Sequence, residues 1–119
     1  LNNQSKISLG SLTPTRDLTY VGDTCNAFIE ISNEDSFYGE VVNVGNNKEI
    51  SIRDLVNLIS NIIEKDVSIE TSSERIRPKD SEVFRLVCDN NKLLSNSNWK
   101  PKISLRSGIT NIYQKWKMK

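Results

Sequence analysis

Two arginine-containing segments hold the residues of this chain that are best suited to chemistry. The first begins with Arg16-Asp17, and the second is Arg75-Ile76-Arg77-Pro78-Lys79-Asp80. A guanidinium group presents paired N–H donors in one plane, and this geometry matches neighbouring phosphate oxygens. Arginines held where loops meet regular elements could therefore grip a diphosphate from two sides.

The residues that would support catalysis at such a site are missing. The chain has no histidine, and no glycine-rich turn follows a predicted strand. Tyr113 and Lys117 have the Tyr-x-x-x-Lys spacing, but they fall in a closing amphipathic helix, where we do not expect a catalytic pair. Ser81 and Glu82 have no neighbouring base. The sequence thus predicts a binding surface without catalytic residues.

The two cysteines, Cys25 and Cys88, are far apart and lack metal-ligand spacing. We expect neither a metal site nor a disulfide, but two reduced cysteines in the core, which favours a cytoplasmic protein.

Length and charge limit the possible functions. A chain of 119 residues predicts one domain, residues 1–119, and the net charge of +1 argues against a nucleic-acid partner. No apolar run approaches the roughly 20 residues that span a bilayer, so we expect no membrane partner. The first residue is leucine and a polar stretch follows it. We therefore expect the chain to begin inside a longer protein.

Short strands alternate with amphipathic helices along the chain, which predicts a mixed α/β (α+β) fold. The predicted strands are 7–12, 18–21, 41–44, 67–70 and 84–88. The predicted helices begin at Asp23, which would cap a helix with Ala27, Phe28 and Ile31 on its inner face, and at Ser51, which forms a capping-box-like pair with Asp54. A short helix is expected over 92–94, capped by Asp89 or Asn90, and a last helix over 105–116. We expect Trp99 and Trp116 to pack in the core.

Several segments, read in order, resemble the carboxy-terminal part of the NAD-dependent nucleotide-sugar epimerases and dehydratases, which are extended short-chain dehydrogenase/reductases. Residues 16–23 resemble the family's Arg-Asp, aromatic, Val, Asp segment, and Asn43-Val44-Gly45 followed by Ser51-Ile52 resembles its Asn-Ile-Gly and Ser-Ile segments. Arg77-Pro78-Lys79-Asp80 resembles Arg-Pro-Gly-Asp with lysine in place of glycine. The closing Asp, Lys, Trp-x-Pro, Ser-Leu, Gly pattern is matched by Asp89, Lys92, Trp99, Pro101, Leu105 and Gly108.

The resemblance implies a small substrate-binding domain without the Rossmann half that holds NAD or NADP in the full-length enzyme. It implies that Arg16 and Arg77 lie along the diphosphate of a nucleotide-diphosphate sugar, with Asp80 near the ribose. No cofactor-binding residue is expected in this chain. The residues around 9–17 and 75–83 look most like dehydratases that act on UDP-N-acetylhexosamines in the synthesis of bacterial surface polysaccharide.

Other interpretations stay open. The chain could be a non-catalytic remnant or an interaction module, or a stand-alone domain whose arginines have no specific role. The base, the sugar, the choice between epimerase and dehydratase, and the origin of the truncation are all left open, as is whether this chain acts as an enzyme. Surface left uncovered by the missing half predicts a homo-oligomer.

Overall fold

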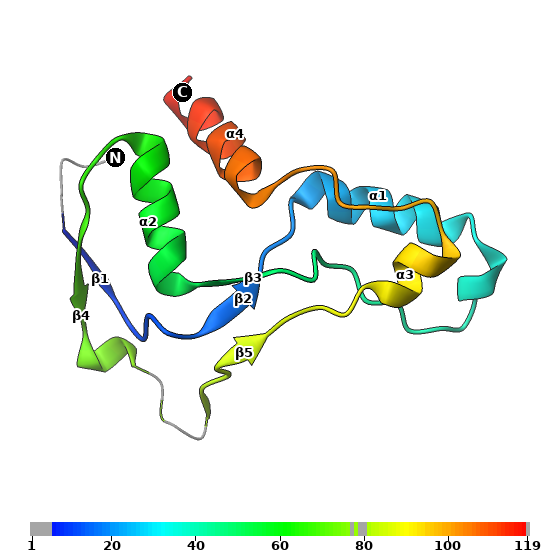
Figure 1. Ribbon diagram of the computed structural model, residues 1–119, viewed down its shortest axis with the longest axis horizontal. Helices are drawn as coiled ribbons and strands as arrows, with labels where there is room; N and C mark the ends of the chain where they lie inside the picture. The colour runs from blue at the N-terminus through cyan, green and yellow to red at the C-terminus, as the bar shows by residue number, and fades with distance from the viewer. Residues whose placement is uncertain (1–5, 77, 79–80, 119) are drawn as a thin grey trace.

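The computed structural model describes residues 6–76, 78 and 81–118 of the chain. Helices and short strands alternate along it, and two small sheets are formed (Figure 1). The elements are β1 (Lys6–Leu9), β2 (Thr15–Asp17), α1 (Val21–Ser32), η1 (Asp35–Phe37), β3 (Glu49–Ser51), α2 (Ile52–Ile63), β4 (Ser68–Thr71), η2 (Ser73–Arg75), β5 (Arg85–Leu86), α3 (Asn91–Asn96) and α4 (Leu105–Lys117).

The two sheets lie in different parts of the molecule. β1 pairs with β4 in parallel, and β2 lies between β3, to which it is antiparallel, and β5, to which it is parallel. In Figure 1 the three-stranded sheet separates the end with α2, β1 and β4 from the end with α1 and α3. The mixed α/β class predicted from the sequence is confirmed.

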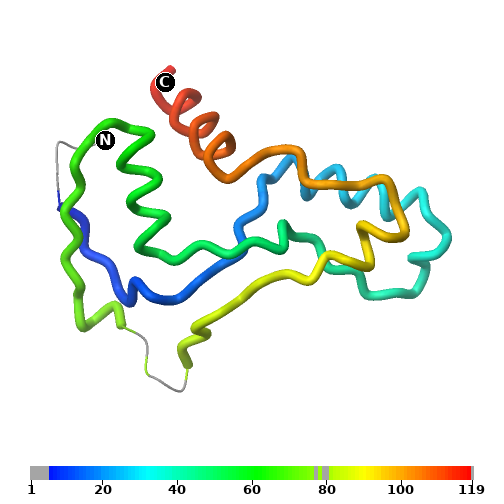
Figure 2. Tube along the Cα trace, in the orientation of Figure 1, coloured from blue at the N-terminus to red at the C-terminus, as the bar shows by residue number. Residues whose placement is uncertain are grey.

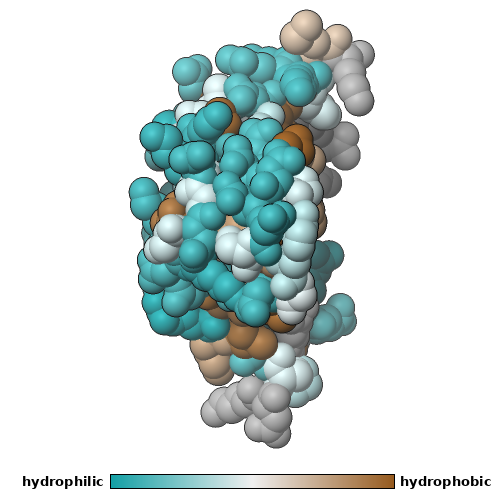
Figure 3. Space-filling model, turned by 90° about the vertical axis from the view of Figure 1, so that its right-hand side faces the viewer, coloured by the Kyte–Doolittle hydropathy of each residue, from teal (hydrophilic) through white to brown (hydrophobic). Residues whose placement is uncertain are grey.

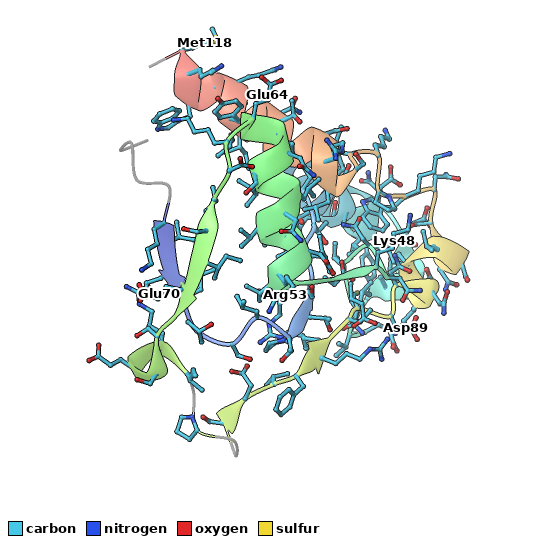
Figure 4. All side chains as sticks on the ribbon, turned by 60° about the vertical axis from the view of Figure 1, so that its left-hand side comes forward. Lys48, Arg53, Glu64, Glu70, Asp89 and Met118 are labelled. Atoms are coloured by element: carbon cyan, nitrogen blue, oxygen red, sulfur yellow. The ribbon has the colours of Figure 1, made fainter. Side chains whose placement is uncertain are left out.

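Helix α2 begins where the sequence predicts. The Ser51 hydroxyl oxygen accepts the backbone N–H of Asp54 at 3.0 Å, so the predicted cap is confirmed. The helix ends at Glu64, whose left-handed backbone (φ 54°) stops further helical hydrogen bonding. α4 begins in the same way, with the Ser104 hydroxyl accepting the N–H of Ser107 at 3.1 Å. In Figure 4, α2 stands between β4 and α4, with Arg53 and Glu64 marking its two ends.

Helix α1 departs from the prediction in two respects. It begins after Tyr20, so Asp23 lies inside its first turn and is not the N-cap. Asp23 is buried, and its carboxylate accepts the backbone N–H of Ile103 at 3.0 Å instead. The predicted inner face is wrong at Phe28, which is 67% exposed, whereas Ala27 is fully buried.

The compact core lies at the α1 and α3 end of the molecule. It consists of Ala27, Phe37, Leu93 and Trp99, with Ile31, Val42 and Val44 packed against it. The Trp99 indole N–H donates to the Asp23 carbonyl oxygen at 2.9 Å, which satisfies its polar atom inside the core. The prediction for Trp99 is confirmed.

Other burial and strand predictions are also wrong. Residues 18–21 do not form the predicted strand, because Leu18 to Tyr20 are irregular and Val21 begins α1. Trp116, in the last turn of α4, is 49% exposed and does not pack in the core. Cys25 is exposed, and Cys88 is only partly buried, although both are free thiols. Val41–Val44 is not a strand, since no ladder partner pairs with it in the described part of the chain.

The molecule is a thin plate of 50 × 41 × 19 Å with a radius of gyration of 17.3 Å. A compact chain of this length would have a radius of gyration of about 13.5 Å. Figure 3 looks onto the right-hand end of Figure 1, and hydrophilic residues dominate that face. Among the described residues, no helix has the length and apolar character needed to cross a membrane.

Candidate functional site

Arg16 lies on β2, the central strand of the three-stranded sheet, between Ile50 of β3 and Leu86 of β5. Its guanidinium group is directed to the chain that precedes β5. Nη1 donates to the carbonyl oxygens of Thr15 at 2.7 Å and Val83 at 2.8 Å. These bonds fix the direction of the side chain, which is a quarter exposed.

A carboxylate also lies beside this arginine. Arg16 Nη2 is 3.6 Å from Oε1 of Glu82, whose side chain is only 11% exposed. At that distance the pair attracts by charge without a hydrogen bond. Nη2 has no other partner in the described part of the chain. Its N–H groups are therefore available as donors to a ligand.

The second arginine segment is described only in part. Arg77 and Asp80 lie outside the described residues. Arg75 is exposed at the end of η2. Because a Cβ at Gly10 would collide with the Arg75 carbonyl, only glycine permits the observed close approach of this segment to the end of β1.

The chain that follows the second arginine segment is hydrogen-bonded to Arg16 and its neighbour Thr15. The N–H of Ser81 donates to the Pro78 carbonyl oxygen at 3.0 Å. Val83 then accepts the bond from Arg16, and Phe84 accepts the N–H of Thr15 at 2.8 Å. Val83, six positions after Arg77, is thus hydrogen-bonded to Arg16 of the first arginine segment.

Asp17 has a role that the sequence did not indicate. It makes no ion pair with Arg16 in the described part of the chain, and its carboxylate accepts three backbone N–H groups, from Asn46 at 3.1 Å, Asn47 at 2.9 Å and Cys88 at 3.2 Å. It therefore ties the end of β2 to two distant loops.

Burial raises the pKa of the Cys88 thiol, with the nearby Asp17 and Asp89 carboxylates adding to the effect. A thiol with a raised pKa is a poor nucleophile at neutral pH.

Tyr113 and Lys117 are in contact, but not in a catalytic arrangement. The Lys117 ammonium lies over the Tyr113 ring, 4.8 Å from its centroid, as a cation–π pair on α4. The described residues contain no group of three or more side chains that could hold a metal ion.

An apolar hollow lies between α2 and α4 and is separate from Arg16. It encloses about 520 Å³ and is lined by Leu18, Thr19, Tyr20, Val21, Leu55, Ile59, Ser104, Leu105, Gly108, Ile109, Asn111, Ile112 and Lys115. Lys115 is the one charged residue in that lining. Such a groove suits apolar side chains and not a diphosphate, so Arg16 is a better candidate for anion binding.

Comparison with known proteins supplies the family. Residues 1–112 match the family model described as GDP-mannose 4,6 dehydratase. A Methanocaldococcus jannaschii protein provisionally named UDP-glucose 4-epimerase is 35% identical over 94% of this chain and 34% of its own length. GDP-L-fucose synthase 1 of Arabidopsis thaliana is 32% identical over 92% of this chain and 32% of its own length. The chain spans about a third of the length of these curated relatives.

Solved structures agree with this result. Pal from Bacillus thuringiensis superposes with a TM-score of 0.77 at 32% identity, over 96% of this chain and 35% of that one. RMD from Pseudomonas aeruginosa, solved with NADPH, gives a TM-score of 0.82 at 24% identity, over 96% of this chain and 36% of that one. UDP-glucuronic acid 4-epimerase from Bacillus cereus, solved with NAD and a fluorinated UDP-sugar, gives a TM-score of 0.79 at 24% identity, over 95% and 35%. The full-length relatives thus bind NAD or NADP.

The ordered motifs, the fold and the match over residues 1–112 lead to one conclusion: this chain belongs to the GDP-mannose 4,6 dehydratase family of NAD-dependent nucleotide-sugar epimerases and dehydratases, and it corresponds to the carboxy-terminal region of its members.

Proposed function

We propose that this chain is the part of an NAD-dependent epimerase or dehydratase that binds the nucleotide-diphosphate sugar, and that it is catalytically incomplete by itself. The family match over residues 1–112 carries the proposal, since relatives are named for UDP- and GDP-sugars. In a longer protein of this family, bound NAD or NADP would supply the hydride chemistry. The role of this chain would be to bind and orient the sugar nucleotide.

Arg16 is the residue through which we expect the diphosphate to be held. The Nη1 bonds to the Thr15 and Val83 carbonyls fix the side chain before a ligand arrives, which reduces the entropy lost on binding. Nη2 is left with a distant carboxylate at 3.6 Å. A phosphate oxygen would give it a charge-assisted hydrogen bond that Glu82 does not provide.

Arg77 and Asp80 complete the proposed site. Arg77 would supply the second guanidinium group, and its position before Pro78 restricts its backbone to extended conformations. Asp80 would accept hydrogen bonds from the ribose hydroxyls. Together the three residues would favour nucleotide-diphosphate sugars over unphosphorylated sugars.

Calorimetric titration of this chain with UDP-glucose, GDP-mannose and free glucose tests the proposal. We expect one of the two nucleotide sugars to bind and glucose not to bind. Arg16→Ala and Arg77→Ala should each weaken binding by about ten-fold or more, because each removes a charge-assisted contact worth roughly 1.5–3 kcal/mol. Arg106→Ala, an exposed arginine on α4, is the matched control.

The Arg16 variant also loses its bond to Val83, so its folding must be checked by circular dichroism. Arg77→Ala provides an independent readout. Full binding by folded Arg16→Ala and Arg77→Ala proteins would contradict the proposed site, and no binding of either nucleotide sugar by the unaltered chain would contradict the proposed function.

A further inference from the structure

Glu82 is the carboxylate beside Arg16, on the chain that leads into β5. In Figure 2 the yellow-green trace of this part of the chain runs below the blue trace of β2, with which β5 pairs. The Glu82 side chain is only 11% exposed, and its Oε1 lies 3.6 Å from Arg16 Nη2. It accepts no hydrogen bond from the described residues. A carboxylate that is largely withdrawn from water and has no hydrogen-bond donor is unfavourable in a folded protein.

Glu82 is not needed to direct the Arg16 side chain. The carbonyl oxygens of Thr15 and Val83, which both accept a hydrogen bond from Nη1, already fix the guanidinium group. At 3.6 Å, Oε1 of Glu82 is too far from Nη2 for a hydrogen bond. Glu82 therefore acts on a ligand through its charge and its own free acceptor positions, and not through the orientation of Arg16.

An anion held by Arg16 must come close to Glu82. A phosphate oxygen that accepts a hydrogen bond from Nη2 lies about 2.8 Å from that nitrogen. Because Oε1 is 3.6 Å from the same nitrogen, the phosphate oxygen lies within about 6.5 Å of Oε1 from any direction of approach. This limit depends only on atoms of this chain, and it holds whether or not other residues of a longer protein cover the site. Two negative charges at such a separation repel each other, so Glu82 weakens the binding of an anion to Arg16.

Hydroxyl groups on a ligand would offset this repulsion. A carboxylate accepts hydrogen bonds and donates none, so inorganic pyrophosphate, whose oxygens are also acceptors, offers it no partner. A nucleotide sugar carries hydroxyl groups on its ribose and on its hexose, and each of them is an O–H donor. A charge-assisted hydrogen bond from one of these hydroxyls would satisfy the Glu82 carboxylate.

We propose, on the basis of the function proposed above, that Glu82 is a specificity-determining residue of the site. Its carboxylate disfavours small anions that bring only negative charge to Arg16, and it favours a diphosphate that carries a hydroxyl donor beside it. Specificity is a difference between affinities, and here a repulsive element acts together with an attractive one. Arg16 supplies affinity for the phosphoryl group, and Glu82 selects among the molecules that carry such a group.

Glu82→Gln tests the proposal, because it removes the charge and keeps the size of the side chain. Calorimetric titrations of the unaltered chain and of this variant use pyrophosphate, UDP, GDP, UDP-glucose and GDP-mannose. Pyrophosphate should bind the variant about three-fold more tightly or better, because the repulsion is removed. The preferred nucleotide sugar should bind about three-fold more weakly or worse, because a charge-assisted hydrogen bond becomes a neutral one. The ratio of the two dissociation constants should therefore change by about ten-fold.

The nucleoside diphosphates identify which hydroxyl Glu82 accepts. If the variant also binds UDP or GDP more weakly, the hydroxyl belongs to the ribose. If only the nucleotide sugar binds more weakly, the hydroxyl belongs to the hexose. Either result supports the proposal, since the carboxylate then distinguishes a hydroxyl-bearing diphosphate from pyrophosphate.

Two further variants separate the charge of Glu82 from its contribution to folding. Glu82→Asp keeps a carboxylate and should retain the discrimination against pyrophosphate. Glu70→Gln removes an equivalent charge, paired with Lys6 at 3.0 Å in the other sheet, and should leave all the dissociation constants unchanged. Circular dichroism checks the fold of each variant. A measurement without any variant is also available, since the unaltered chain should bind pyrophosphate about ten-fold more weakly than the preferred nucleotide sugar.

The outcomes distinguish this inference from the proposed function. An unaltered chain that binds no nucleotide sugar would contradict the proposed function, and the inference with it. If a nucleotide sugar binds but pyrophosphate binds equally well, the inference alone is overturned. The same holds if folded Glu82→Gln keeps the ratio of dissociation constants unchanged, or if Glu70→Gln changes that ratio as much as Glu82→Gln does.

Discussion

The two ends of this molecule bury their apolar side chains to very different extents. At the α1 and α3 end, Ala27, Phe37, Leu93 and Trp99 are each at most 4% exposed. At the other end, α2 has a continuous apolar stripe and yet not one of its residues is buried. Amphipathic periodicity thus identifies the apolar face of a helix. It does not show whether other residues of this chain pack against that face.

Buried polar contacts join the elements at the core end, whereas a groove separates the two helices at the α2 end. At the core end, the buried Asp23 accepts the N–H of Ile103 through its carboxylate and the Trp99 indole through its carbonyl. Asn90 is also buried and donates to the Gly45 carbonyl. At the α2 end, a groove of about 520 Å³ remains between α2 and α4. We infer that most of the folding free energy comes from the core end, because buried contacts contribute more than half-exposed ones.

The largest expected effect comes from a matched pair of leucines. Leu93→Ala should lower the free energy of unfolding by about 2–5 kcal/mol, because Leu93 is fully buried and its removal leaves a cavity. Leu55→Ala on α2 should cost clearly less, because that side chain borders an open groove. Urea denaturation of both variants measures the difference. Equal losses would show that the two ends contribute equally and would remove the basis of the comparison.

A smaller but still substantial effect is expected at Asp17, which joins the core end to the three-stranded sheet. Asp17→Ala leaves the N–H groups of Asn46, Asn47 and Cys88 without their acceptor. We expect a loss of about 1.5–3 kcal/mol, the range for hydrogen bonds to charged groups. Urea denaturation measures it, and Asp54→Ala, which removes an exposed carboxylate on α2, should cost less. A negligible loss for Asp17→Ala would mean that water replaces the carboxylate.

Local patterns in the sequence predict some parts of this fold correctly. Ser51 and Asp54 indicate the start of α2, and the structure begins the helix there. A cap needs only residues within one turn, so it can be inferred from spacing alone. The prediction that Trp99 packs in the core is also correct. The family follows from five ordered motifs, and the comparison confirms it.

The errors concern interactions between distant parts of the chain. Asp23 has the residue type of a cap, but its partner is Ile103, which is 80 positions away. Asp17 stands beside Arg16 in the sequence, but its carboxylate binds the distant loops at 46–47 and 88, which no local pattern indicates. Val41–Val44 has strand composition, yet pairing requires a second strand that the described residues do not provide. For the candidate site, the sequence indicated Arg16 but gave no sign of its contacts with Val83 and Glu82.

The smallest effect is expected in the three-stranded sheet, at Glu49, and it depends on pH. The Thr15 hydroxyl donates to the Glu49 carboxylate at 2.6 Å and Arg85 Nε donates at 2.9 Å, and these bonds lower the pKa of Glu49 below its ordinary value of 4.5. A carboxyl whose pKa is lower in the folded state stabilises the fold above the unfolded pKa, and this stabilisation is lost as the pH falls toward the folded pKa.

Glu49→Gln should therefore lower the thermal midpoint slightly at neutral pH, and the difference from the unaltered chain should shrink as the pH falls below 4.5. Thermal denaturation at a series of pH values measures this convergence. Glu74→Gln, at an exposed position of η2, is the control. Its difference in thermal midpoint from the unaltered chain should not change with pH. Since Glu49 is accessible to solvent, salt should weaken its attraction to Arg85. A difference that persists unchanged at acid pH would mean that packing of the side chain, and not its charge, links β3 to β2 and β5.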